Sequence, residues 1–185
     1  MIITELLAIL SIAAATGLRL ALPLLLIGLL SGSQLWSNVP LLSRLPPALV
    51  LGVLVSWSMA ELMLSKSSNS QRFFQGLELI LSPGVGALAG LGVARTFGLE
   101  GWLYPLIGLI SALLALVIQL LQMGLFFRPR RPPLWSFFVV DGLCIVLAIL
   151  AFDAPKQGGI IALLLLWLVI RTSYLWQRWP RRSRS

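Results

Sequence analysis

Residues 2–30 read IITELLAILSIAAATGLRLALPLLLIGLL, and this stretch decides which kind of fold is open to the chain. It is apolar apart from five positions, which are Thr4, Glu5, Ser11, Thr16 and Arg19. A helix needs about 20 apolar residues to cross a bilayer. The stretch is therefore long enough for one tilted membrane helix or for two short helical pieces.

A charge lies in the middle of this stretch, in the segment Gly17-Leu18-Arg19-Leu20-Ala21-Leu22-Pro23. Proline removes one backbone hydrogen bond from a helix and clashes with the carbonyl four residues earlier, and glycine weakens helical backbone. We therefore expect the first span to be broken near Arg19, with Gly17 and Pro23 as the residues that break it.

Further apolar stretches of helical length follow along the chain, and they cover residues 46–64, 77–97, 102–127, 134–152 and 160–176. The stretch 77–97 contains Pro83, at which we expect a second helix break. None of the stretches shows the alternating pattern of a barrel strand. The sequence predicts an all-α, polytopic membrane protein with about six transmembrane spans, forming a single domain over residues 1–176 with a basic cytoplasmic tail at 177–185.

The composition of the 185 residues limits the chemistry that the chain can perform. Apolar residues make up 58% and charged residues 11%, against roughly 45–50% and 25% in soluble domains. There is no His and only one Cys, Cys144, in an apolar run. We expect no catalytic residue, no metal site and no cofactor, and we expect Cys144 to be a buried apolar side chain.

The positive charges gather near the predicted span ends. Arginines that we expect to contact anionic lipid headgroups, not nucleic acid, are Arg128, Arg130, Arg131, Arg181 and Arg182. Lys and Arg are enriched in cytoplasmic loops. With six spans, this bias predicts that both termini face the cytoplasm, in a bacterial inner membrane or another internal membrane.

Four ionisable residues lie inside predicted spans, where a charge is costly and suggests a function. They are Arg19, Glu61, Glu78 and Asp141. One interpretation is a buried ion pair that locks the helices together. The other is a polar site for an anion or a small polar solute, with Arg19 at its centre.

Small residues follow Pro83 in the segment Gly84-Val85-Gly86-Ala87-Leu88-Ala89-Gly90. Gly86 and Gly90 form a G-x-x-x-G pair, which allows two membrane helices to approach closely. The segment does not fit a phosphate-binding loop, since no Lys-Ser/Thr pair follows, nor a dinucleotide fingerprint, since no strand precedes it. We expect helix packing here.

The order of these motifs resembles a family of bacterial integral membrane proteins described only as a domain of unknown function. The resemblance rests on Gly17-x-Arg19 followed by Pro23, on Glu61 and Lys66, and on Pro83-x-x-Gly86-Ala87. It covers residues 5–125 well and the last two spans loosely. It implies a compact helical membrane fold and no assigned activity.

The chain departs from that family in its acidic cluster. The family pattern has aspartates and a proline after the glutamate, where this chain has Ser65, Ser68, Gln71 and Gln75. If the function of the family needs that cluster, this member has lost most of it.

Two functions follow from these observations. The first is a permease or channel for an ion or small solute, with a polar site around Arg19. The alternative is a structural or assembly subunit of a membrane complex, bound to a membrane-protein partner or to further copies of itself. An enzyme acting on lipid is disfavoured, because the chain has no His and no pair of aspartates within one helical turn.

Overall fold

The computed structural model describes residues 2–30, 37–64, 68–99, 101–126 and 134–177, and the regular elements in these ranges are all helical. They are α1 (Ile2–Leu18), α2 (Ala21–Leu30), the short 3₁₀ helix η2 (Leu42–Arg44), α3 (Pro47–Leu64), α4 (Ser68–Thr96), α5 (Leu103–Phe126), α6 (Leu134–Asp153) and α7 (Pro155–Gln177). The predicted all-α class is confirmed.

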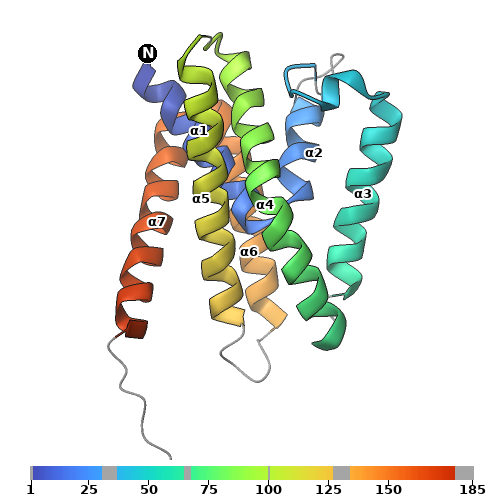
Figure 1. Cartoon of the computed structure of the whole chain (residues 1–185), viewed down its shortest axis with the longest axis vertical. Helices are drawn as coiled ribbons and strands as arrows, with labels where there is room; N and C mark the ends of the chain where they lie inside the picture. Colours follow the sequence, from blue (N-terminus) through green and yellow to red (C-terminus); the bar gives the residue numbers. More distant parts are fainter. Residues whose placement is uncertain (1, 31–36, 65–67, 100, 127–133, 178–185) are drawn as a thin grey trace, which may run out of the picture.

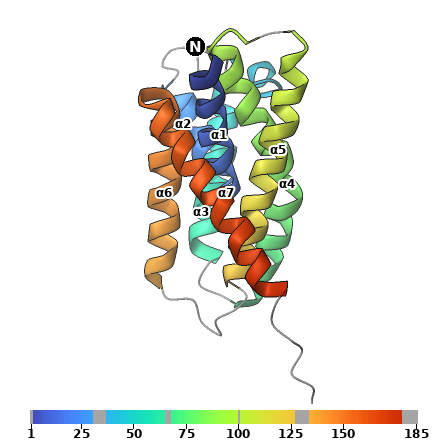
Figure 2. The same cartoon turned by 90° about the vertical axis from the view of Figure 1, so that its left-hand side faces the viewer.

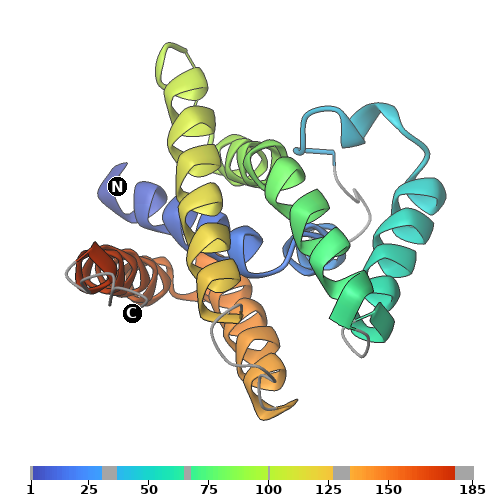
Figure 3. The ribbon, with the colours of Figure 1, turned by 60° about the horizontal axis from the view of Figure 1, so that its bottom comes forward.

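The helices form one bundle in which α1 is central and contacts α4, α5, α6 and α7. Figure 3 looks obliquely along the bundle and shows α1 among these helices, with α3 at the edge. The buried face of α1 consists largely of small side chains, including Ala8, Ala13, Ala14 and Ala15. These let the surrounding helices approach its backbone closely.

The direction of each helix is visible in Figures 1 and 2. Helix α1 begins at the upper end of the bundle and α2 returns to that end, so the two form a hairpin. Helices α3, α5 and α7 then run downward, and α4 and α6 run upward. The beginning of α1 and the end of α7 consequently lie at opposite ends of the bundle.

Helix α4 is continuous from Ser68 to Thr96, with Pro83 inside it. The expected helix break at Pro83 is therefore wrong. The proline lacks the N–H that would bond the carbonyl of Leu79, and such a loss bends a helix more often than it ends one. Figure 3 shows α4 changing direction about half-way along its length.

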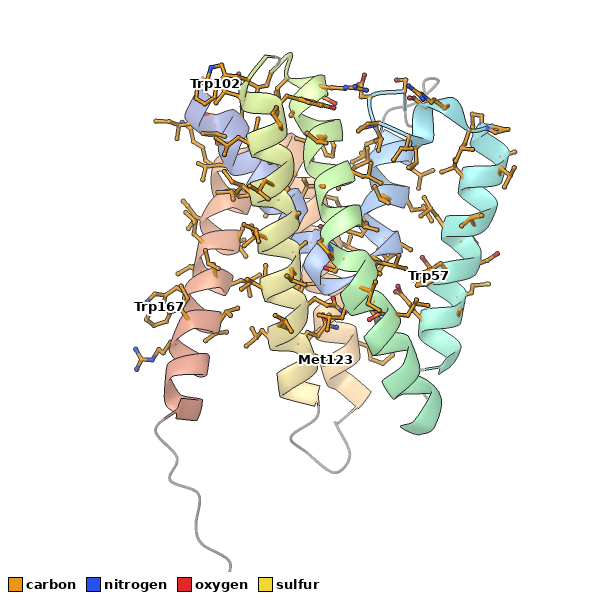
Figure 4. The ribbon with its side chains drawn as sticks, viewed as in Figure 1. Trp57, Trp102, Met123 and Trp167 are labelled. Carbon is orange, nitrogen blue, oxygen red and sulfur yellow. The ribbon has the colours of Figure 1, made fainter. Side chains whose placement is uncertain are left out.

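The outward faces of the helices carry large apolar side chains, among them Ile80, Leu109 and Phe138, which are exposed. In Figure 4, Trp102 and Trp167 also point away from the bundle. Polar side chains such as Ser11, Thr16 and Ser82 are buried instead. An apolar outside around a small and polar inside is typical of helices surrounded by lipid.

By length and composition, two helical stretches of the described chain could cross a membrane, Gly76–Thr96 and Leu103–Met123. Shorter apolar stretches are Ile3–Leu18, Ala21–Leu30 and Pro47–Glu61. The described part of the chain is thus all-helical, with two apolar stretches of membrane length.

Candidate functional site

Arg19 lies between two helices in the middle of the bundle. Helix α1 ends at Leu18 and α2 begins at Ala21, so Arg19 and Leu20 form the connection. The backbone N–H of Arg19 still donates to the carbonyl of Ala15 at 3.0 Å, which closes the last turn of α1. Pro23 lies in the first turn of α2, where its missing N–H costs little. In a continuous helix the same proline would clash with the carbonyl of Arg19.

Gly17 places this connection against α5. A side chain at Gly17 would meet the carbonyl oxygen of Ala115 at 2.7 Å and Cβ of Ile118 at 2.8 Å. Only a residue without Cβ can approach the α5 backbone so closely. The glycine of the Gly17-x-Arg19 segment therefore acts through packing, and it brings the end of α1 onto α5.

The guanidinium of Arg19 contacts carboxylates from two other helices. Its Nε donates to Oδ1 of Asp141 on α6 at 2.5 Å, and its Nη1 lies 3.6 Å from Oε2 of Glu61 on α3. Arg19 is 8% exposed and Glu61 is 5% exposed. Paired charges that are buried stabilise one another only when their hydrogen bonds are made. The arginine thus ties the α1–α2 connection to both sides of the bundle.

Trp57 holds the Glu61 carboxylate in place from one helical turn earlier on α3. Its Nε1–H donates to Oε1 of Glu61 at 2.7 Å, while the other carboxylate oxygen faces Arg19. Figure 4 shows Trp57 pointing from α3 toward the bundle. Each oxygen of Glu61 therefore has a separate donor, which fixes the orientation of the carboxylate.

Glu78 belongs to the same region but has a different partner. Its Oε2 accepts a hydrogen bond from Nε2 of Gln119 on α5 at 3.1 Å. Within the described residues, the ion pairs of Arg19 are those with Asp141 and Glu61, and Glu78 forms none. The sequence grouped all four ionisable residues, and the structure divides them into an Arg19–Asp141–Glu61 cluster and a Glu78–Gln119 pair.

Gly86 and Gly90 bring α4 into close contact with α5. A Cβ at Gly86 would lie 2.5 Å from Cβ of Ala115 and 2.9 Å from the carbonyl oxygen of Ser111. A Cβ at Gly90 would overlap the side chain of Ser111. The two glycines therefore allow a packing distance that alanine could not, and this packing sets the position of Glu78.

The neutral polar partners, Trp57 and Gln119, are not among the site residues that the sequence predicted. A signal for Gln119 was available, since Gln119 and Gln122 are spaced by three residues inside the very apolar span 102–127. Neutral amides cost less in an apolar span than charges do, so they stood out less. The lipid-contact arginines Arg128, Arg130, Arg131, Arg181 and Arg182 lie outside the described residues.

The site contains one positive charge and three carboxylates, a composition suited to binding ions or polar solutes. Among the described residues, no group of three or more His, Cys, Asp and Glu side chains could hold a metal ion. Cys144 is buried, as expected, and its Sγ donates to the carbonyl of Ala15 at 3.4 Å. It therefore supports the end of α1, one turn before Arg19.

Comparisons with known proteins add one finding. No curated protein matches the chain, and no solved structure does. One family model matches residues 6–174, which include every helix that contributes to the site. The chain therefore belongs to the family described as a domain of unknown function, DUF4126.

Proposed function

We propose that the protein is a membrane permease or channel for an ion or a small polar solute, with its polar site around Arg19. The observation that carries this proposal is the uneven charge of the site, where one guanidinium contacts the carboxylates of Glu61 and Asp141, and a third carboxylate, Glu78, is bonded to a neutral amide in the same region. A purely structural lock would need one carboxylate for one arginine. The extra carboxylates, which are costly at membrane depth, are explained if the site also binds a ligand.

The interrupted first span supports the same function. Irregular backbone at membrane depth is tolerated where it is buried in protein or lines a polar cavity. Many transporters place their substrate site at discontinuous helices of this kind. Here the interruption coincides with Arg19, so the break and the charge belong to one site.

We infer a membrane topology that differs from six spans. Helix α2 has 10 residues, which is about 15 Å of helix and too short to cross a hydrocarbon core of about 30 Å. In this topology α3 to α7 are five crossings, and α1 and α2 form a hairpin that enters and leaves on one side.

The charge bias assigns the two sides of this topology. The lower end in Figure 1 is where α3, α5 and α7 end. In the sequence these helix ends are followed by the positive segments that contain Lys66, Arg128 to Arg131 and Arg178 to Arg184. The lower end is then cytoplasmic, with anionic lipid as the partner of these arginines, and the upper end is not.

Charge movement in proteoliposomes tests the permease proposal. The purified protein is adsorbed on a solid-supported membrane and given concentration jumps of Na⁺, K⁺, H⁺, chloride, acetate and glycine. We expect a protein-dependent current for at least one of these probes, abolished in Arg19→Gln. Asp153→Asn is the matched control, because Asp153 is an exposed carboxylate at the far end of α6. Currents equal to those of empty liposomes for every probe, or unchanged in Arg19→Gln, would contradict the proposal.

A second candidate, an assembly subunit, is favoured by a groove on α3. Small residues recur every four positions on this edge helix and, with Leu49, Val53 and Trp57, line a shallow groove of about 470 Å³; they are Ala48, Gly52, Ser56 and Ala60. A Cβ at Gly52 would meet nothing within 4 Å. Small-x-x-x-small faces of this type pack against another transmembrane helix.

The oligomeric state tests the second candidate. If a second copy covers the groove, light scattering of the protein in mild detergent should give the mass of a dimer. Gly52→Leu should convert it to a monomer, and Gly84→Leu, in an open position on α4, should not. A wild-type monomer would count against self-association through α3.

A further inference from the structure

The contact between α4 and α5 follows a regular register that can be extended beyond the glycines. Gly90 packs against Ser111, and Gly86 packs against Ala115. The two helices are antiparallel (Figure 1), so a step of four residues back along α4 matches a step of four forward along α5. Continued by the same step, this register would pair Ser82 with Gln119, and Glu78 with the turn that contains Gln122.

The hydrogen bond between Glu78 and Gln119 agrees with this register, because it joins Gln119 in the first of these rungs to Glu78 in the next. The contact between α4 and α5 thus changes character along its length. It consists of glycine, alanine and serine at one end, and of oxygen-bearing side chains from both helices at the other. We call the second part, formed by Glu78, Ser82, Gln119 and Gln122, the oxygen-lined segment.

Several oxygens of this segment are buried and lack a hydrogen-bond partner. They are Oγ of Ser82, Oε1 of Gln119 and Oε1 of Gln122. Ser82 is fully buried and Gln119 is 3% exposed. A buried polar atom without a hydrogen-bond partner destabilises the folded state, and such groups in a native structure call for an explanation such as a bound ion.

Glu78 adds a negative charge to these neutral oxygens. The hydrogen bond that it accepts comes from a neutral amide, and Arg19 is engaged by Asp141 and Glu61. Among the charged side chains that the structure describes, Arg19 and Glu61 are close enough to Glu78 to interact with it electrostatically. One positive charge placed beside Glu78 would balance that carboxylate and leave one negative charge in excess among the four ionisable groups.

We propose that the oxygen-lined segment between α4 and α5 binds a monovalent alkali cation such as Na⁺, with the Glu78 carboxylate and the oxygens of Ser82, Gln119 and Gln122 as its ligands. The proposal deepens the proposed function and rests on it for its role, since the cation is then the transported or coupling ion. A proton on Glu78 would balance the charge, but it could satisfy only one of the unpartnered oxygens. A divalent ion usually takes six or more oxygens with several carboxylates, and a single carboxylate suits a monovalent ion.

Thermal unfolding of the purified full-length protein in detergent tests the binding itself. Tm is measured as NaCl replaces choline chloride at constant total chloride, and again with KCl and LiCl. Because a ligand that binds only the native state stabilises it, we expect Tm to rise and saturate with at least one alkali ion. Glu78→Gln keeps the shape of the side chain and should abolish the rise. Ser82→Ala removes one ligand and should weaken the apparent affinity about tenfold, the equivalent of one hydrogen bond to a charged group.

Asp153→Asn is the control, because it makes the same charge change as Glu78→Gln at an exposed position, and it should keep the full response. Identical Tm values in choline and in all three alkali ions would overturn the proposal, and so would a response that Glu78→Gln retains. A Tm that depends on pH but on none of the alkali ions, and that loses its pH dependence in Glu78→Gln, would overturn the proposal and indicate that Glu78 binds a proton. If Glu78→Gln does not fold, an unchanged affinity in Ser82→Ala is the contrary result.

The outcome is separable from that of the permease test. Alkali-ion binding without current for any probe would retain the cation site and reject transport. Current without alkali-ion binding would retain transport and reject the cation site.

Discussion

Arg19 has carboxylate partners at two different distances, and this difference should be measurable in the stability of variants. The contact with Asp141 is 2.5 Å and that with Glu61 is 3.6 Å. Glu61 also has a second donor in Trp57. Asp141 should therefore be the main partner of the guanidinium, and Glu61 an additional acceptor.

Asp141→Asn should lower the free energy of unfolding by about 3 kcal/mol or more, because it leaves a buried charge without its close partner. Glu61→Gln should lower it by about 1 kcal/mol, because the amide oxygen can still accept from Trp57. Unfolding of the purified protein with increasing SDS, followed by tryptophan fluorescence, measures both. Equal losses in the two variants would show that Arg19 does not favour Asp141.

The sequence identified the charged residues of the site but not which of them pair with one another. Arg19, Glu61, Glu78 and Asp141 stand out because a charge in an apolar span is costly. Which carboxylate pairs with Arg19 depends on how four helices are arranged around α1, and spacing along the chain contains no information on that. The types of the neutral partners Trp57 and Gln119 likewise do not indicate which carboxylate each of them meets.

At the scale of helices, glycine positions separate close contacts from open surface. Gly84 and Gly86 lie two residues apart on α4, but a Cβ at Gly84 meets nothing within 4 Å and one at Gly86 meets α5 at 2.5 Å. Alanine at either position changes helix propensity by the same amount. Only at Gly86 does the added methyl group also meet α5.

Gly84→Ala should raise the free energy of unfolding by up to about 1 kcal/mol, since alanine favours the helix. Gly86→Ala should lower it by about 1–3 kcal/mol, since the added methyl group forces α4 and α5 apart. SDS titration of the two variants, run in parallel, checks the signs. A stabilised Gly86→Ala would mean that α4 and α5 are not in close contact.

The sequence predicted the break at Arg19 more successfully than the one at Pro83, and the surroundings explain why. At Arg19, proline, glycine and a charge act together within seven residues. At Pro83, the neighbours are apolar or small, and α5 supports α4 through Gly86 and Gly90. Long-range packing thus keeps α4 continuous. Gly158 and Gly159 pack in the same way against Ser11 and Leu7, and they join α7 to α1. No G-x-x-x-G motif in the sequence indicated this contact.

The hairpin of α1 and α2 decides whether the two ends of the chain lie at the same end of the bundle or at opposite ends. A first span that crossed the membrane would place both termini on one side. A hairpin that returns to its own side places them on opposite sides, as the ends of α1 and α7 lie in Figure 2. In the proposed topology the positive-charge count assigns the cytoplasmic side as before, and five crossings in place of six put the two termini on opposite sides.

Single cysteines introduced into a Cys144→Ala background should report this topology. Ile3→Cys and Ser43→Cys, both at exposed positions at the upper end, should react with a membrane-impermeant maleimide in intact cells. Ser183→Cys, in the basic tail, should react only after the membrane is opened. Labelling of Ile3→Cys and Ser183→Cys from the same side would restore the six-span topology.

The contact between Arg19 and Asp141 also sets an order of events during synthesis. The two residues are 122 positions apart, so the ribosome makes Arg19 long before α6 exists. Until then the guanidinium has no partner on α6, and an unpaired charge enters hydrocarbon only at a high cost. In the proposed topology, we therefore expect the hairpin to take its final place at the centre of the bundle only after α6 has been made.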